Sequence, residues 1–569
     1  MVQIKLELEK IILIIFFIIL LFIGPGSLLD YRIKHEFPYA YLSSDSFQHQ
    51  IRAEAVKDAG NFRYEAFYIS KGFEKAVGRY PPIIYHLSVI FSYATGLEVY
   101  DAIYFIVFFF SIIGAFVMYL IIRNFNKNVA LIALPLAIIM ISPQLYIDQN
   151  NSLTKVNFGI NTGFAYGHWP SLLSQVFLIG FFWCIMRLDS EKSYIFTAII
   201  FSSIILTHTS EAVFALIFLG LFFLIRLIGK NLKKIEVRNI AIALAISFIF
   251  SVYYVIIFMN TWAKANPYTF SVDTIWKGNP GIYIGSFGLL LIFMAAGFIF
   301  SLFKLLDMHI SLISAFAMLI SGSLNYIGFE LRAFQIRFFW PIYLSVFFGF
   351  GVYIVLKLFI KMWNMIYTAL LVLIFTVLLM GIIKIPHYIK VPSIPHYNKL
   401  VSQGLMDSYH WSALNWLSKN AEFGSKIYFF YGDIYSQDAL LRNSKRLHYQ
   451  VDPDDFFKAL NERKIKRNYV SELPGDGGGG IVTRLGLFKF EDVIKSKPQE
   501  YFFGIQDICK FDYLVFDKPR NDKDIKIYNL MILSELSKKN FISKVFENEG
   551  LIVLKNSKIG ADCIEERSF

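Results

Sequence analysis

Long runs of apolar residues dominate the first two thirds of the chain and predict membrane-spanning helices. The first run, residues 11–23, follows two lysines, and no small-x-small cleavage site comes after it. We therefore interpret it as a retained helix rather than a removed signal peptide. Ten further runs approach the ~20 residues that a transmembrane helix needs. They make eleven predicted spans with the first and cover residues 101–122, 129–147, 171–187, 193–208, 211–228, 239–259, 282–303, 310–327, 338–357 and 363–383.

The basic residues between these runs predict the orientation of the chain. If the shorter apolar stretch 82–96 does not cross, the turns on the N-terminal side hold 14 Lys and Arg residues, and the opposite short loops hold five. Cytoplasmic loops carry the excess of Lys and Arg. If 82–96 did cross, the basic cluster 226–238 would face outward. We therefore expect a cytoplasmic N-terminus, with 82–96 re-entrant or interfacial.

Two polar regions fall on the outer side in this topology. One is the long first loop, residues 28–99, within a transmembrane domain covering residues 1–383. The other is residues 384–569, which we expect to form an extracytoplasmic soluble domain. Its patterns mix helix with strand and predict an α/β fold: helices over 409–419 and 454–463, and strands over 426–431, 513–516 and 551–554.

Composition agrees with a multi-pass cell-membrane protein. The chain has 569 residues, of which 56% are hydrophobic and 17% charged, and soluble proteins carry about 25% charged residues. This excludes a disordered or fibrous chain and speaks against nucleic acid as a partner. Much of the net charge of +12 follows from the topology. Of three cysteines, Cys509 and Cys563 either pair in the outer region or remain free thiols.

A polar segment in the first outer loop predicts a helix that carries candidate chemistry. Ser43 or Ser44 can cap it. At 100° per residue, Asp45, His49 and Arg52 share one face. We expect a helix on the membrane surface with this face pointing away from lipid, and Phe47, Ile51 and Ala55 on the opposite side. The alternative is that Asp45 only interacts favourably with the helix dipole.

The stretch from Gly78 to Gly96 comes next and contains Tyr80, Pro81 and Pro82 before an apolar half-span. The two prolines favour an extended entry. A non-spanning segment at membrane depth must be covered by protein or line a cavity. We expect it to form one wall of an outward-facing cavity.

The order of these features resembles the GT-C superfamily of polyprenyl-phosphate-dependent glycosyltransferases, distantly the oligosaccharyltransferases or protein mannosyltransferases. Two later segments are similar to motifs of that superfamily. Residues 206–212 resemble a His motif at the outer end of a span, and residues 332–341 resemble an Arg-aromatic-Pro helix start. A soluble domain after the last helix also fits. The resemblance covers the layout of the whole chain.

This resemblance implies a glycosyltransferase that moves a sugar from a polyprenyl-phosphate donor to an extracytoplasmic acceptor, which is a glycan, a lipid or a protein. Asp45 corresponds to the carboxylate that activates the acceptor. Arg337, and Arg332 with less support, would hold the lipid phosphate. The alternative for both arginines is an interfacial side chain reaching to lipid headgroups. The further candidates for substrate binding are His49, Arg52, His208 and Glu211.

The sequence also departs from the oligosaccharyltransferases. Their paired acidic residues in the second outer loop are missing, because Asp148 is the only carboxylate there. Recognition of a peptide sequon and a tightly held divalent metal are therefore both in doubt. Mg²⁺ and Mn²⁺ stay open as cofactors, and no nucleotide cofactor is expected. A transporter and a non-catalytic protein with the same fold remain as alternatives.

Overall fold

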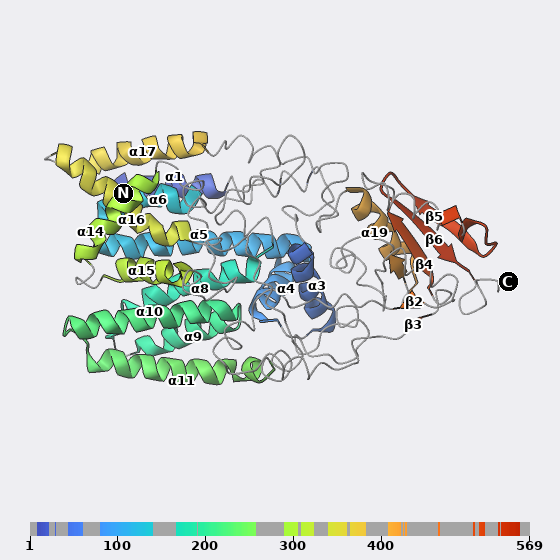
Figure 1. Ribbon diagram of the computed structural model, residues 1–569, viewed down its shortest axis with the longest axis horizontal. Helices are drawn as coiled ribbons and strands as arrows, with labels where there is room; N and C mark the ends of the chain where they lie inside the picture. The colour runs from blue at the N-terminus through green and yellow to red at the C-terminus, as the bar shows by residue number, and fades with distance from the viewer. Residues whose placement is uncertain are drawn as a thin grey trace, which may run out of the picture.

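The protein is described by a computed structural model in which helices pack side by side in a bundle, with the C-terminal tail beyond one end (Figure 1). The structure describes residues 8–21, 29, 33, 44–60, 80–139, 167–190, 192–257, 290–304, 309–323, 340–360, 365–382, 408–422, 425, 427–429, 465–466, 505–506, 511–517, 533–534 and 536–557. We call the end of the bundle next to the tail the tail-side end, and the opposite end, where the chain starts, the N-terminal end (Figure 1).

Each of the eleven predicted apolar runs contains a helix. In chain order these are α1 (Leu8–Leu21), α5 (Val99–Phe125), α6 (Lys127–Ile139), α8 (Trp169–Ile185), α9 (Ser193–Ile205), α10 (Thr209–Ile228), α11 (Lys234–Ile257), α14 (Leu290–Lys304), α15 (Ile310–Ser323), α16 (Trp340–Phe359) and α17 (Met365–Ile382). In the described part, three helices are long and apolar enough to cross a membrane, namely α5, α10 and α11. Eight shorter helices are apolar, and they include Ile83–Thr95 but not α1. The number of spans therefore stays a prediction.

Two further helices lie at the tail-side end. They are α3 (Ser44–Ala59) and α4 (Ile83–Thr95), and Figure 1 shows both between the bundle and the tail. The apolar stretch 82–96 is thus a helix that ends at Gly96, whose φ of 74° is easy only for glycine.

Close backbone contacts join α14, α16 and α6. A Cβ on Gly297 of α14 would collide with the carbonyl of Phe347, and one on Gly351 of α16 would collide with the carbonyl of Phe293. Gly349, also on α16, faces the carbonyl of Val129 on α6 in the same way. Small residues let membrane helices approach at backbone distance, which maximises van der Waals contact. These three helices therefore depend on glycine for their packing.

Charged residues gather at the N-terminal end of the bundle. Glu9 of α1 is 4% exposed, and it contacts Arg123 and Lys127 at 2.5 Å each and the hydroxyl of Tyr119. These contacts fix α1 to the junction of α5 and α6. The basic residues that set the predicted topology are therefore also structural partners of a buried carboxylate.

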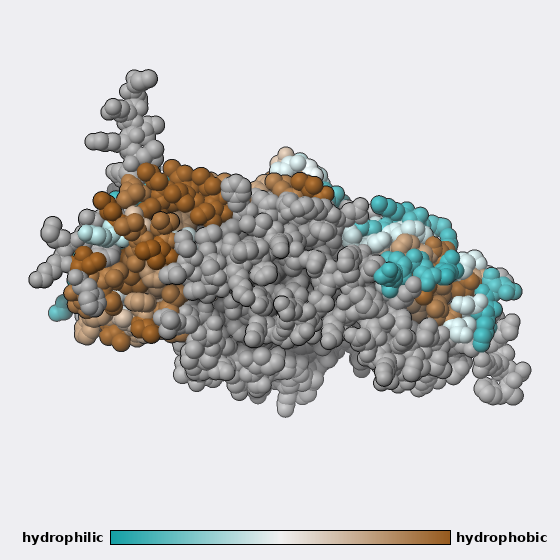
Figure 2. Space-filling model, turned by 90° about the horizontal axis from the view of Figure 1, so that it is seen from above, coloured by the Kyte–Doolittle hydropathy of each residue, from teal (hydrophilic) through white to brown (hydrophobic). Residues whose placement is uncertain are grey.

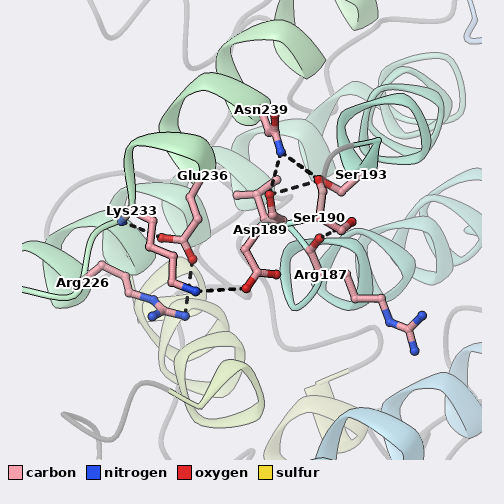
Figure 3. A network of polar contacts seen from close by, with 9 residues as sticks. Arg187, Asp189, Ser190, Ser193, Arg226, Lys233, Glu236 and Asn239 are labelled. Atoms are coloured by element: carbon pink, nitrogen blue, oxygen red, sulfur yellow. Dashed lines mark hydrogen bonds and ion pairs between the residues drawn. The ribbon is translucent and has the colours of Figure 1, made fainter.

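A second polar network at this end connects two turns of the bundle (Figure 3). Lys233 reaches Asp189 at 3.0 Å, and Arg226 reaches Glu236 at 3.7 Å. The side-chain amide of Asn239 donates to the carbonyl oxygens of Leu188 and Ser190 at 2.8 and 3.1 Å. The turn between α8 and α9 is thereby tied to the start of α11.

The described part of the tail combines one helix with short strands. They are α19 (Ser408–Asn420), β1 (Ile427–Phe429), β2 (Ile465–Lys466), β3 (Ile505–Gln506), β4 (Tyr513–Asp517), β5 (Ile542–Glu547) and β6 (Leu551–Asn556). Four strands form a sheet in the order β1-β4-β6-β5, parallel between β1 and β4 and antiparallel elsewhere. The predicted helix over 454–463 lies outside the described residues.

Aromatic contacts join α19 to the sheet and to the bundle. Trp416 packs against Phe546 of β5 with ring centroids 5.3 Å apart. Trp411 meets Tyr100, in the first turn of α5, edge to face at 5.9 Å. Figure 2 shows a hydrophobic surface over the bundle, while most of the described tail surface is hydrophilic. The tail therefore rests on the bundle through a helix that is part of its own core.

Candidate functional site

The predicted helix in the first outer loop is present and is fixed to α4. It begins at Ser44, so Asp45 lies in its first turn as expected. Lys57 donates from Nζ to the hydroxyl of Ser92 at 3.2 Å, and the hydroxyl of Tyr93 donates to the carbonyl of Lys57 at 3.2 Å. The pair α3 and α4 therefore forms one unit. The side chain of Asp45 lies outside what the structure describes.

Protein covers the polar face of α3, which the sequence predicts only to point away from lipid. His49 is 3% exposed and Arg52 7%, and Ile51 on the other side is 2% exposed. Helical periodicity separates the two faces correctly, but it does not show that protein covers both of them. Because α3 packs on α4 and α5, its polar side chains are enclosed.

An aromatic cluster surrounds His49. Its Nδ1 lies 2.9 Å from the hydroxyl of Tyr85, and its ring centroid is 5.4 Å from Tyr80 and 6.3 Å from Trp169. The guanidinium of Arg52 lies over the Tyr80 ring, 4.8 Å from its centroid. A cation over an aromatic face is stabilised by the ring quadrupole. Two predicted site residues, His49 and Arg52, are thus brought together around Tyr80.

A second cluster forms where α9 ends and α10 begins. Glu211 is 1% exposed, and its Oε2 is 2.5 Å from Nδ1 of His208, so the structure brings these two candidate residues together. Its Oε1 accepts hydrogen bonds from the hydroxyl of Ser171 at 2.5 Å and from the amide of Gln175 at 3.5 Å. Ser171 and Gln175 were not predicted. They share one face of α8, and only the packing of α8 on α10 brings them to Glu211.

The electrostatics of this cluster favour a charged histidine. Burial of the ring acts to lower the pKa of His208, but the charge of Glu211 and its hydrogen bond outweigh burial, and the net shift of the pKa is upward. An opposite charge at hydrogen-bond distance favours the charged form in this way. The cluster therefore favours an ion pair in which a protonated His208 ring faces the carboxylate of Glu211.

An apolar cavity of about 540 Å³ lies beside both clusters. Pro82 and His86 at the start of α4 form part of its wall, and the amide of Ile83 donates to the carbonyl of Leu206 at 3.1 Å, two residues before His208. Its aromatic lining comes from α5, α8 and α11: Phe110, Phe177, Phe250, Tyr253 and Tyr254. The predicted cavity wall at residues 82–96 is therefore present.

The cavity opens toward the outside of the bundle. Phe250 and Tyr253 line it and are also 57% and 44% exposed, so they form its rim on α11. Tyr85, whose hydroxyl contacts His49, lies between the lining residues Ile83 and His86, which connects the cavity to the aromatic cluster around His49. The arrangement suits a ligand that is apolar along most of its length and polar at one end.

Other predicted features lie outside the described residues. They include Arg332, Arg337, Asp148, Cys509 and Cys563. Within the described ranges, no three His, Cys, Asp or Glu side chains come together as metal ligands.

Comparison with solved structures identifies the fold. ArnT from Cupriavidus metallidurans bound to undecaprenyl phosphate superposes with a TM-score of 0.52 and 11% sequence identity, covering 95% of this chain and 97% of ArnT. Its apo form gives a TM-score of 0.54 at 10% identity. The oligosaccharyltransferase of Archaeoglobus fulgidus, in complex with Zn and sulfate, gives 0.53 at 13% identity, covering 89% of this chain and 68% of the other.

These neighbours are GT-C glycosyltransferases, so the resemblance read from the sequence is confirmed at the level of the fold. The sequence itself matches no protein-family model and no curated protein. At this identity the similarity establishes the fold, and the activity has to be argued from the site.

Proposed function

We propose that this protein is a membrane glycosyltransferase that moves a sugar from a polyprenyl-phosphate donor to an acceptor on the outer side of the membrane. The observation that carries the proposal is the apolar cavity with a buried ionisable cluster beside its wall. Its volume lies within the ~300–1,000 Å³ typical of ligand sites. A polyprenyl phosphate has the matching chemistry, with a long apolar chain and an anionic head.

The proposed roles follow from the charges of each group. Asp45, at the start of α3, would take the proton of the acceptor. Arg337, with Arg332 as a second candidate, would bind the donor phosphate, because a planar guanidinium matches two phosphate oxygens. The enclosed polar face of α3, with His49 and Arg52, would order the acceptor side of the site. ArnT supports the choice of donor, since it has been crystallised with undecaprenyl phosphate.

The proposed topology places this site in the outer half of the membrane. In it the N-terminus and the basic turns are cytoplasmic, and residues 384–569 form a separate extracytoplasmic domain. The common end of the turns that hold Arg123, Arg187 and Arg226 supports this orientation. Protease added to intact cells should cleave the tail and leave the basic turn 226–238 intact.

The decisive experiment is turnover by the purified protein in liposomes. Polyprenyl-phosphate sugars labelled in the sugar are supplied together with candidate glycan, lipid and peptide acceptors. We expect label in one acceptor class and release of polyprenyl phosphate. Arg337→Lys should raise KM for the donor more than it lowers the melting temperature, because it keeps the charge and loses the planar fork. Donor that is carried across the bilayer unchanged would favour a transporter instead.

A further inference from the structure

Glu211 is enclosed too deeply to touch a substrate. Its side chain is 1% exposed, and described groups already occupy both of its oxygens: Ser171 and Gln175 on Oε1, and His208 on Oε2. Glu211 is therefore placed to act through His208 and not, as expected from the sequence, to bind a substrate itself. The side chain of His208 is 31% exposed.

The contact with Glu211 sets the orientation of the His208 ring. Because Nδ1 is held by the carboxylate, Nε2 lies on the far side of the ring from Glu211. His208 directly precedes α10, and its backbone carbonyl accepts a hydrogen bond from the Ser174 hydroxyl at 3.3 Å. The chain leading into His208 belongs to the cavity wall through Ser203 and Leu206. The contact with Glu211 thus fixes the ring, and the backbone of His208 follows two residues after Leu206 of the cavity wall.

We propose that Glu211 is a positioning residue that holds the His208 ring by its Nδ1, so that His208 donates a hydrogen bond from Nε2 to the phosphate of the lipid donor at the cavity edge. This inference rests on the proposed function and adds a second phosphate-binding group to it. The pairing also explains why the carboxylate of Glu211 can lie near the proposed phosphate site. Without a cationic partner, this carboxylate would repel the anionic donor.

The described groups that interact with this pair include one further titratable side chain. Tyr343 of α16 interacts electrostatically with Glu211, and its hydroxyl lies 3.4 Å from the carbonyl oxygen of Gln175. Ser171 and Gln175 of α8 are uncharged donors to the carboxylate. Histidine is thus the member of this cluster whose charge changes near neutral pH.

The inference predicts how donor affinity depends on pH. Below the raised pKa of His208 the ring is charged and the phosphate is bound more tightly. As the pH rises through that pKa, the site loses one positive charge. A hydrogen bond to a charged group contributes enough that the dissociation constant should rise about tenfold. The midpoint should lie above the ordinary value of about 6.5.

The test measures the dissociation constant of a polyprenyl phosphate methyl ester for the full-length protein in detergent, from about pH 5.5 to about pH 9. This phosphodiester keeps a single negative charge over the range, so only the protein titrates. Glu211→Gln, which keeps the shape and removes the charge, should move the midpoint to lower pH. Ser171→Ala, the matched control, removes one hydrogen bond from the same carboxylate and should leave the midpoint near that of the wild type.

His208→Gln should bind the ester about tenfold more weakly at low pH and show no pH dependence. An unchanged midpoint in Glu211→Gln, or persisting pH dependence in His208→Gln, overturns the inference. Neither result contradicts the proposal that the donor is a polyprenyl phosphate. If Glu211→Gln does not fold, the result for His208→Gln decides alone. Absence of binding by the wild type at every pH would instead overturn the proposed polyprenyl-phosphate donor, and the inference with it.

Discussion

The two ends of the helical bundle differ in the partners of their carboxylates. At the N-terminal end, Glu9 contacts a lysine and an arginine, and Figure 3 shows Asp189 and Glu236 paired with Lys233 and Arg226. At the tail-side end, Glu211 contacts a histidine and two uncharged side chains. Lysine and arginine keep their charge across the physiological range, while histidine does not. The first end is therefore electrostatically constant, and the second responds to pH.

The difference extends to the surroundings of these groups. At the N-terminal end, the ion pairs and hydrogen bonds of the charged residues hold neighbouring helices and turns together, so each of these contacts has a structural role. The tail-side end encloses a polar helix, an aromatic cluster and an apolar cavity. Perturbed ionisable groups beside a cavity are typical of functional sites. We therefore expect substitutions at the N-terminal end to change stability and substitutions at the tail-side end to change activity.

The largest effect is expected at the tail-side end from Asp45→Asn. Turnover should fall by ~10²–10⁴ because the acceptor loses its base. The free energy of unfolding should fall by no more than ~1 kcal/mol, the contribution of a charge at a helix N-terminus. Asp58→Asn is the control, since Asp58 is exposed near the other end of α3. Wild-type turnover in Asp45→Asn, measured with labelled donor, would end the catalytic assignment.

At the N-terminal end, Glu9→Gln should reduce stability and leave catalysis unchanged. The variant loses the charge that Arg123 and Lys127 contact, and we expect the free energy of unfolding to fall by ~1–3 kcal/mol. Thermal unfolding in detergent measures the loss, and kcat of the folded fraction should equal that of the wild type. Glu547→Gln, which removes an exposed pair with Lys544, is the matched substitution with little expected effect. A lowered kcat in Glu9→Gln would contradict the expectation that this end affects stability and not catalysis.

A smaller effect is expected from the pH dependence of stability at the tail-side end. Because the pKa of His208 is raised in the folded protein, the pair with Glu211 stabilises fully below about pH 6.5, and this contribution is lost as the pH rises through the folded pKa. The difference in melting temperature between the wild type and His208→Gln should therefore shrink with rising pH. A difference that grows with pH would contradict the assigned charge state.

The smallest effect should come from Asp189→Asn. The hydrogen bond from Lys233 lowers the pKa of Asp189, so its stabilisation is present above the ordinary value near 3.9 and is lost on acidification. Both side chains are about half exposed, so the variant should lose only ~0–1 kcal/mol at neutral pH, and less in high salt. Melting curves at two salt concentrations measure this. A loss larger than that of Glu9→Gln would contradict the ranking.

The sequence predicts local features of this fold well, because they depend on neighbouring residues. The apolar runs locate the helices, and the Ser44–Asp45 start of α3 follows from capping preferences. The contact of His208 with Glu211 is also local, since His208 directly precedes α10 and Glu211 lies in its first turn, but the two residues are predicted from the sequence as separate candidates and not as a pair. These features need no knowledge of the tertiary structure.

Contacts between distant segments are the part that the sequence does not predict. Nothing in the residues around Glu9 indicates that Arg123 and Lys127 lie beside it, and nothing around Ser171 indicates Glu211. The burial of both faces of α3 was missed for the same reason, because periodicity gives the direction of a side chain and not what covers it. The cavity likewise arises from five helices that are far apart in the chain.

The glycine contacts between α6, α14 and α16 have a mechanical consequence. Where backbone meets backbone, no side chain is left to adjust its rotamer, so these three helices should move together as one body. On the opposite side of the cavity, α11 packs mainly on α9 and carries the exposed rim residues Phe250 and Tyr253. We therefore expect the microsecond-to-millisecond motions that admit a long lipid chain to occur in α11, with the glycine-joined helices as the fixed frame.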